Sequence, residues 1–191
     1  KWIADFRDPW TNMEYFSKLN LLNESKKKHF DLQEKVISKA DLTLTVSDSW
    51  SKDLSRLGAK KTAVVFNGFE NSNSIIESHD KFRIGHFGLF NELRDHAEMW
   101  KALNLTLSRN KNFKEDLEIY FSGPTHKNFH KNLKSHHLDS YLNYFEWNNL
   151  EKMKQEMLKC NVLIVSQSNT EDAMGRLPAK FFEYLGTGIP I

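Results

Sequence analysis

The chain has 191 residues, of which 39% are hydrophobic and 14 are phenylalanines, enough apolar material for one large domain or two small ones. A formal net charge of +2 is too small to indicate a nucleic-acid-binding protein. The single cysteine, Cys160, excludes an intrachain disulfide framework, and no apolar run is long enough to span a bilayer. With no segment that resembles a signal peptide, these features predict a cytoplasmic protein.

The first part of the chain contains three short runs of buried-strand length. They are "WIADF" (2–6), "LTLTVS" (42–47) and "TAVVF" (62–66). Between the first two, apolar residues recur at helical intervals from about 28 to 40. The stretch "SDSWSKDLSRLG" (47–58) begins with capping residues and ends at a glycine, which predicts a short helix.

A polar stretch rich in Asn and Ser, 71–80, is the predicted linker to a second part of the chain. Strands are expected after it at 82–88, 117–123, 141–147 and 161–168, and the last looks the most buried. Helical patterns are expected from Leu93 to Leu107, after 123, over 150–160 and at the end of the chain.

This alternation of strands and helices predicts an α/β fold with two Rossmann-like parallel sheets, one over 1–70 and the other over 81–191. In open parallel sheets, ligands bind beyond the carboxyl ends of the strands. That rule points to four short segments that we expect to line one rim. They are "FG" (87–88), "SG" (122–123), "EW" (146–147) and "SQSNT" (166–170).

The closing helix is expected to begin near Leu177 and Pro178. Its spacing predicts a face toward the sheet made of Leu177, Phe181, Phe182 and Leu185. The opposite side would carry Arg176, Lys180 and Glu183. Two cations at the start of a helix suit an anion, and a carboxylate one turn further on suits a pair of sugar hydroxyls. The alternative is an ordinary solvated helix face.

The stretch "GRLPAKFFEYLGTGIP" resembles the donor-binding helix of GT-B glycosyltransferases, particularly those of the retaining family 4 type. Members of that family have a Glu, then seven residues, then Glu-Ala-x-Ala-x-Gly-x-Pro. Glu183 and the final Gly-x-Pro match the second half, whereas the first Glu would fall on Gly175 and is absent. The "KFFEYL" of 180–185 matches the Lys-x-x-Glu-Tyr-Leu form of many bacterial surface-polysaccharide relatives.

Further segments resemble the same family, in the order that the family has them. "IADFRDPW" is similar to a late strand and cleft loop of the N-terminal domain, and "AVVFNGFE" to the Asn-Gly element that closes that domain. "RIGHFGLFNELRD" resembles the first strand and loop of the C-terminal domain, and "LNYFEWNNLEKM" the strand and loop that receive the nucleobase.

The resemblance implies a GT-B fold, with the end of an acceptor-side domain over 1–70 and most of a donor-side domain over 81–191. It implies a transferase for hexosyl or other glycosyl groups, retaining and metal-independent, with a nucleotide-diphosphate sugar as donor and a glycan or lipid-linked acceptor. No cofactor is implied. By the family pattern, parts of both domains are missing, so we expect this fragment alone to be inactive.

The resemblance also implies roles for individual residues. The implied donor-binding residues are Gly88, Leu89, Arg94, Glu146, Trp147, Arg176, Lys180 and Glu183. Among them, Arg94, Lys180 and Glu183 are the candidates for catalysis. Asp5, Arg7 and Asp8 are expected in the acceptor cleft, and the alternative is an Arg–Asp pair that only pins the loop.

Two other functions stay open: a sugar-nucleotide 2-epimerase of the same fold, and a non-catalytic nucleotide-binding domain, which the missing first Glu favours. The basic clusters at 26–29 and 126–137 suit either contact with anionic lipid at the inner face of the plasma membrane or a solvated helix face. The histidines of the second cluster lack a supporting carboxylate or cysteine pattern, so no metal site is expected.

Overall fold

The computed structural model of the chain describes residues 1–191 except 14, 70–79 and 146–148, and except the side chains of 150, 171 and 172. The chain forms two compact units. Unit 1 consists of Lys1–Gly68 and Asn169–Ala179, and unit 2 of Phe69–Ser168 and Lys180–Ile191. Most of the predicted linker at 71–80 lies outside the described residues, so the predicted domain boundaries stay a prediction.

Unit 1 has a parallel sheet of three strands in the order β1 (Ile3–Asp5), β2 (Leu42–Thr45) and β3 (Thr62–Val64). Helix α1 (Asn23–Lys39) connects β1 to β2, and α2 (Asp48–Arg56) connects β2 to β3. These helices are the crossover connections that parallel strands need. Their core consists of Ala4, Phe6, Ile37, Ala40 and Leu54.

The helices of unit 1 follow from local sequence. The Ser47 hydroxyl accepts a hydrogen bond from the Trp50 N–H at 3.3 Å and caps α2, and Gly58, with φ of +96°, follows its end, as predicted. Helix α1 starts at Asn23, earlier than the predicted start near 28. The prediction followed the spacing of apolar residues, and the first turns of the helix are polar. Two 3₁₀ turns, η1 (Trp10–Asn12) and η2 (Phe16–Lys18), precede it.

Unit 2 has a parallel sheet with the strand order β6, β5, β4, β7. The strands are β4 (Phe82–Phe87), β5 (Leu117–Ser122), β6 (Leu142–Phe145) and β7 (Val162–Leu163). The helices are α3 (Ala97–Arg109), α4 (Lys111–Asp116), α5 (Phe129–Ser135), α6 (Leu150–Leu158) and α7 (Ala179–Leu185). Leu93, expected in a helix with α3, lies in a separate 3₁₀ turn, η3 (Glu92–Arg94).

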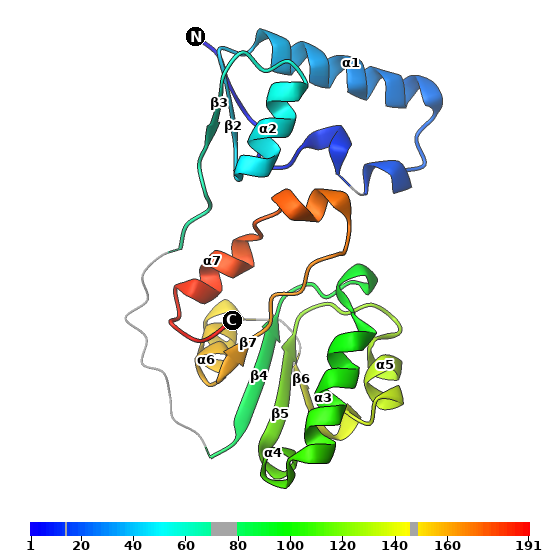
Figure 1. Ribbon diagram of the computed structural model, residues 1–191, viewed down its shortest axis with the longest axis vertical. Coiled ribbons are helices and arrows are strands. Elements are labelled where there is room, and N and C mark those ends of the chain that lie inside the picture. Colours follow the sequence, from blue (N-terminus) through cyan, green and yellow to red (C-terminus); the bar gives the residue numbers. More distant parts are fainter. Residues whose placement is uncertain (14, 70–79, 146–148) are drawn as a thin grey trace. The chain divides into compact units, whose positions relative to one another are not determined.

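Helices cover both faces of this sheet, so unit 2 has three layers (Figure 1). The alternation of β5 shows the two faces. Ile119 and Phe121 pack with residues of α3 and α5, whereas Tyr120 packs with residues of α6 and α7. Because all four strands are parallel, their carboxyl ends share one edge, as predicted.

Strand β7 is the clearest departure from the predicted elements of unit 2. The prediction of a long, most-buried strand over 161–168 is wrong, since only Val162 and Leu163 form it, beside β4. A continued parallel ladder would next join the Phe87 N–H to the Ile164 carbonyl. Instead, the Tyr184 hydroxyl accepts from the Phe87 N–H at 2.9 Å, and His86 Nδ1 contacts the Ile164 oxygen at 3.0 Å. Two side chains therefore end the ladder.

Candidate functional site

The carboxyl ends of β4 and β5 meet at two glycines. Gly88 has φ of +111° and Gly123 has φ of +113°, a region that glycine adopts readily and other residues rarely. The Gly88 N–H donates to the Ser122 carbonyl at 2.6 Å, and a Cβ on Gly123 would lie 2.8 Å from the Gly88 backbone. The strands thus end in bare backbone, which another group can approach closely.

The Lys180 side chain, from α7, lies against Gly88. A Cβ on Gly88 would lie 3.1 Å from Lys180 Nζ and 3.3 Å from its Cε. Burial and, to a smaller extent, the positive charge of Arg94 lower the pKa of Lys180 to about 8, although the charge of Glu183 acts in the opposite direction. The protein therefore holds a partly desolvated ammonium group at the end of β4, where an anion would offset the cost of its burial.

His86, from β4, is the contact partner of this ammonium group. It is only 1% exposed, and its Nε2 lies 3.0 Å from Lys180 Nζ. Because the Ile164 carbonyl can only accept, we assign the ring proton to His86 Nδ1, which leaves Nε2 to accept from Lys180. Burial, with the nearby Lys180 charge, lowers the pKa of His86 to about 3, so the ring is neutral near pH 7.

Arg94 lies at the end of η3, close to the same charges. Its Nη1 donates to the Leu89 carbonyl at 3.1 Å, and its own carbonyl accepts from the Ser166 hydroxyl at 2.5 Å. The Arg94 charge lowers the pKa of both Lys180 and His86. The structure thus brings three predicted donor-site residues together around one unpredicted histidine. We refer to His86, Gly88, Arg94 and Lys180 as the Lys180 corner.

The orientation of α7 differs from the prediction. Tyr184 is fully buried, and its hydroxyl accepts from the Phe87 N–H and donates to the Phe87 carbonyl at 3.3 Å. Leu185, expected to face the sheet, is 45% exposed. Lys180, one turn before Tyr184, points toward β4, so its predicted place on the solvated side is wrong. The reason is that Tyr184 has a polar tip for the open backbone of β4, which leucine lacks.

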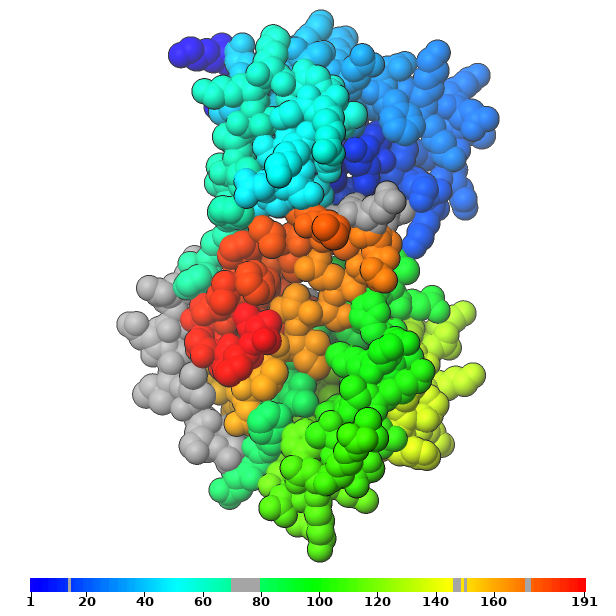
Figure 2. Space-filling view, in the orientation of Figure 1, coloured from blue at the N-terminus to red at the C-terminus, as the bar shows by residue number. Residues whose placement is uncertain are grey.

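The other predicted donor residues have different positions. Glu183 is exposed on α7. The closing residues of the chain, coloured red in Figure 2, lie on the visible surface of unit 2. Glu146 and Trp147, predicted to receive the nucleobase, lie outside the described residues. Arg176 belongs to unit 1, whereas the Lys180 corner belongs to unit 2. The binding and catalytic roles of all these residues stay predictions.

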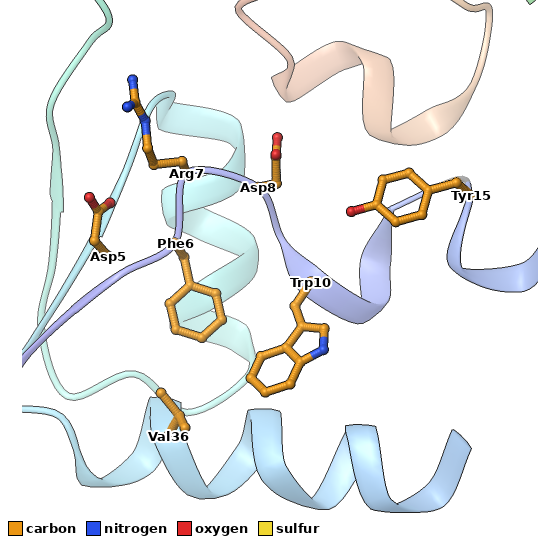
Figure 3. Close-up of a pocket in the computed structure, with 7 residues that line it drawn as sticks. All are labelled: Asp5, Phe6, Arg7, Asp8, Trp10, Tyr15 and Val36. Carbon is orange, nitrogen blue, oxygen red and sulfur yellow. The ribbon is translucent and has the colours of Figure 1, made fainter. Parts of the chain in front are cut away.

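Asp5, Arg7 and Asp8, the predicted acceptor residues, line one pocket of unit 1. Its full lining is Asp5, Phe6, Arg7, Asp8, Trp10, Tyr15 and Val36. Arg7 and Asp8 project from the loop after β1 in one direction, while the Phe6 and Trp10 rings project in the other, toward α1 (Figure 3). Trp10 has φ of +38°, unusual for a residue with a side chain, and its indole N–H donates to His29 Nδ1 at 3.2 Å. The residues predicted for the acceptor cleft did not include these aromatic side chains.

Arg7 forms a hydrogen bond that the sequence did not suggest. Its guanidinium donates to the Asn67 side-chain oxygen, and Asn67 in turn donates to the Leu177 carbonyl at 3.1 Å. Within the described part of the chain, Arg7 therefore bonds the Asn-Gly element rather than an aspartate. The pinning of the loop by an Arg–Asp pair stays a prediction.

Gly175 occupies the position of the missing first Glu of the motif. A Cβ on Gly175 would lie 2.1 Å from Cδ1 and 2.2 Å from Nε1 of Trp50, a residue of α2 that is 2% exposed. No side chain fits at 175 while Trp50 is in place. Packing within unit 1 thus gives a physical reason for the departure from the motif.

Across the residues that the structure describes, no group of three or more His, Cys, Asp and Glu side chains could hold a metal ion. In the second basic cluster, His126 Nε2 instead contacts the Asp95 carboxylate at 2.6 Å, and Asn132 donates to the same carboxylate at 2.8 Å. Over the same described ranges, no helix has both the length and the apolar character needed to cross a membrane.

No family model matches the sequence, and no curated protein matches it. Solved structures of glycosyltransferases are nevertheless similar in fold. WaaG, a glycosyltransferase involved in lipopolysaccharide biosynthesis, matches with a TM-score of 0.64 and 10% identity over 98% of this chain and 55% of that chain. The lipopolysaccharide outer core galactosyltransferase WaaB matches with a TM-score of 0.57 and 18% identity over 84% of this chain and 45% of that chain.

A mutant of TarM from S. aureus, solved in complex with Fondaparinux, alpha-GlcNAc-glycerol and UDP, matches with a TM-score of 0.65 and 11% identity. The match covers 90% of this chain and 33% of that chain. At such low identities the likeness shows the fold, and it confirms the predicted α/β fold of the GT-B type. The matched regions span 55% of WaaG and 45% of WaaB, so this chain covers about half of each.

Proposed function

We propose that this chain is part of a glycosyltransferase that moves a sugar from a nucleotide-diphosphate donor to a glycan or lipid-linked acceptor, with retention and without a metal ion. The observation that carries the proposal is the Lys180 corner. It places a half-buried ammonium group and Arg94 at bare glycine backbone, at the carboxyl ends of parallel strands. The fold shared with glycosyltransferases supports this assignment, and the UDP bound to TarM makes UDP the first ligand to test.

In this reaction, negative charge develops on the diphosphate as its bond to the sugar breaks. Lys180 and Arg94 stabilise that charge, because both are held in place before the reaction and Lys180 is partly shielded from water. Gly88 allows phosphate oxygens to approach Lys180 without meeting a side chain. In other phosphate sites a metal ion neutralises the phosphate charge. Here Lys180 and Arg94 would do so, which is the basis for proposing metal independence.

Glu183 is proposed to accept hydrogen bonds from both hydroxyls of the donor ribose. It lies on the same helix as Lys180, three residues later, and its charge acts on the Lys180 ammonium. A carboxylate has enough acceptor sites for two hydroxyls at once. Its exposure in the described chain leaves it accessible to a ligand.

The pocket of unit 1 is proposed to bind the acceptor. Asp5 and Asp8 offer carboxylates for sugar hydroxyls, and Trp10 and Tyr15 offer aromatic surface for the apolar face of a sugar ring. For a lipid-linked acceptor, we propose a cytoplasmic protein that contacts the inner face of the plasma membrane. Lys27 and Lys28, exposed on α1, supply cations for anionic lipid.

Titration calorimetry with UDP, GDP and ADP tests the donor site. Glu183→Ala should weaken the best of these ligands by about 1.5–3 kcal/mol, the range for hydrogen bonds to charged groups. The wild type should prefer the ribose over the 2′-deoxyribose form, and the mutant should lose that preference. Glu98→Ala, which removes an exposed acid of α3 in the same unit, is the matched control and should change neither value.

Equal affinity of the wild type and Glu183→Ala for both sugar forms would remove Glu183 from the donor site. The non-catalytic alternative is favoured by the Trp50–Gly175 packing, which leaves no room for the first Glu. The non-catalytic alternative predicts that the protein binds nucleotides but transfers no sugar. A transfer assay on the full-length protein with UDP-sugars separates the two, because only a transferase releases UDP together with a glycosylated acceptor.

A further inference from the structure

We propose that His86 positions Lys180 for the donor diphosphate. Its Nε2 accepts a hydrogen bond from the Lys180 ammonium group. The Ile164 carbonyl fixes the tautomer of the ring by accepting the proton on Nδ1. This inference rests on the proposed function, since it assigns the diphosphate to Lys180. His86 does not touch the ligand in this proposal, and it acts only through Lys180.

The break in the sheet between β4 and β7 gives His86 its backbone partner. The ladder between β4 and β7 stops before the hydrogen bond that would join the Phe87 N–H to the Ile164 carbonyl. Tyr184 occupies the first and His86 the second. A buried carbonyl left unpaired would be costly, so the His86 Nδ1–H has a defined partner. Two aromatic neighbours hold the ring as well, with Phe121 stacked at 5.1 Å and Phe90 at 4.9 Å between centroids.

The fixed tautomer determines what the second ring nitrogen of His86 can do. With Nδ1 protonated, the lone pair of Nε2 is directed to the Lys180 ammonium group at 3.0 Å. A lysine side chain has a long flexible stem that otherwise extends its charge into water. The contact with His86 keeps Nζ beside Gly88 instead, and reduces the conformational freedom that would be lost when a diphosphate binds.

The neutral charge of the His86 ring also favours this role. Among the described residues, the charged groups that act on Lys180 are Arg94 from η3 and Glu183 from its own helix. A protonated histidine would add a second repulsive charge at 3.0 Å from Nζ. The pKa of His86, lowered to about 3, excludes this state at neutral pH. The ring is therefore an acceptor for the ammonium group and not a competitor for the anion.

The test is a double-mutant cycle on UDP affinity, with GDP and ADP measured in parallel, using the chain as it exists. The variants are His86→Phe, which keeps an aromatic ring but has no acceptor, Lys180→Met, and the two combined. Lys180→Met should weaken binding about tenfold or more. His86→Phe should weaken it about threefold to tenfold, and should have no further effect once Lys180 is Met. His86→Gln, which has a neutral acceptor, should recover most of the loss.

An effect of His86→Phe that persists in the Lys180→Met background, or that His86→Gln fails to recover, would assign His86 a purely structural role. NMR of the imidazole nitrogens of the unmutated chain tests the contact without any substitution that could impair folding. We expect a neutral ring protonated at Nδ1 near pH 6, with an Nε2 shift that changes in Lys180→Met. An imidazolium or the other tautomer would overturn the inference.

The two proposals fail in different ways. If none of the three nucleotides binds the wild type, the donor-site proposal fails, and the positioning role fails with it. If UDP binds and Lys180→Met weakens binding but His86→Phe does not, only the role of His86 is overturned.

Discussion

The Lys180 corner and the pocket of unit 1 are built in opposite ways. In the corner, His86 is buried, Lys180 is half-buried, and both have hydrogen-bond partners. In the pocket, Asp5, Arg7 and Asp8 are exposed beside an aromatic wall. Satisfied polar networks in a low-dielectric surrounding are rigid, whereas exposed side chains rearrange at little cost. The polar groups of the corner are therefore held in one arrangement, whereas the charged side chains of the pocket can take several.

The largest effect should come from removing the buried support of the corner. Tyr184→Ala deletes a fully buried ring and leaves the Phe87 N–H without its partner, so we expect a loss of about 3–5 kcal/mol in the free energy of unfolding of unit 2. Leu185→Ala, on the exposed side of the same helix, should cost less than about 1 kcal/mol. Denaturant titration of both variants measures the difference.

Cys160 gives this measurement a probe within unit 2. Burial raises the pKa of its thiol to about 12, so it should react with thiol reagents only when the unit opens. Labelling of Cys160 should therefore become faster in Tyr184→Ala than in Leu185→Ala. Similar labelling rates and stabilities for the two variants would mean that Tyr184 is not the buried anchor of α7.

A smaller effect should separate the two regions by pH. A diphosphate prefers the protonated form of Lys180, and the free protein loses that proton as the pH rises through about 8. Affinity for ADP should therefore fall above this pH, by up to about tenfold per pH unit. His86, with a pKa of about 3, stays neutral throughout, and Arg94 and Glu183 are the other charged neighbours.

Lys180→Arg is the control for this pH dependence, because a guanidinium group stays protonated. Its affinity curve should be flat over the same range, whatever its absolute affinity. Calorimetry at constant ionic strength measures both curves. A wild-type curve as flat as that of Lys180→Arg would exclude contact between the diphosphate and the Lys180 ammonium group.

The smallest effect on stability is expected in the pocket. Arg7→Ala removes an exposed side chain that bonds Asn67, so it should change the free energy of unfolding by less than about 1 kcal/mol. In the full-length protein it should weaken transfer to the acceptor more than it weakens folding. Arg56→Ala, which removes an exposed arginine paired with Asp53 on α2, is the matched control and should leave transfer unchanged. A large drop in melting temperature with normal transfer would make Arg7 structural.

Most elements of both sheets could be predicted from the sequence, because near-continuous apolar strands and capped helices are local patterns. The caps of α2 at Ser47 and Gly58 are examples. The orientation of α7 could not be predicted in the same way. Hydrophobic periodicity assigned the sheet-facing position to Leu185, whereas Tyr184 is buried because the unmade ladder bond of β4 offers its hydroxyl a partner. That bond depends on tertiary contacts, which the pattern does not contain.

The candidate site, like the fold, could be predicted only in part from the sequence. The motif pointed to Gly88, Arg94 and Lys180, which the structure places together in unit 2. It did not point to His86, although a histidine in the otherwise apolar end of "FRIGHFG" is a signal that could have been used. Its contact with Lys180 joins residues 94 positions apart, and no local rule reaches that far.

The break between β4 and β7 makes the amide of Phe87 an intrinsic reporter of α7 docking. In an uninterrupted sheet, such an amide proton exchanges with solvent when neighbouring strands separate. Here its acceptor is the Tyr184 hydroxyl, so it becomes exchangeable whenever α7 leaves the sheet, even while β4 and β5 stay paired. Deuterium uptake at this one position therefore follows the helix that carries Lys180 and Glu183, on the native protein and without a label.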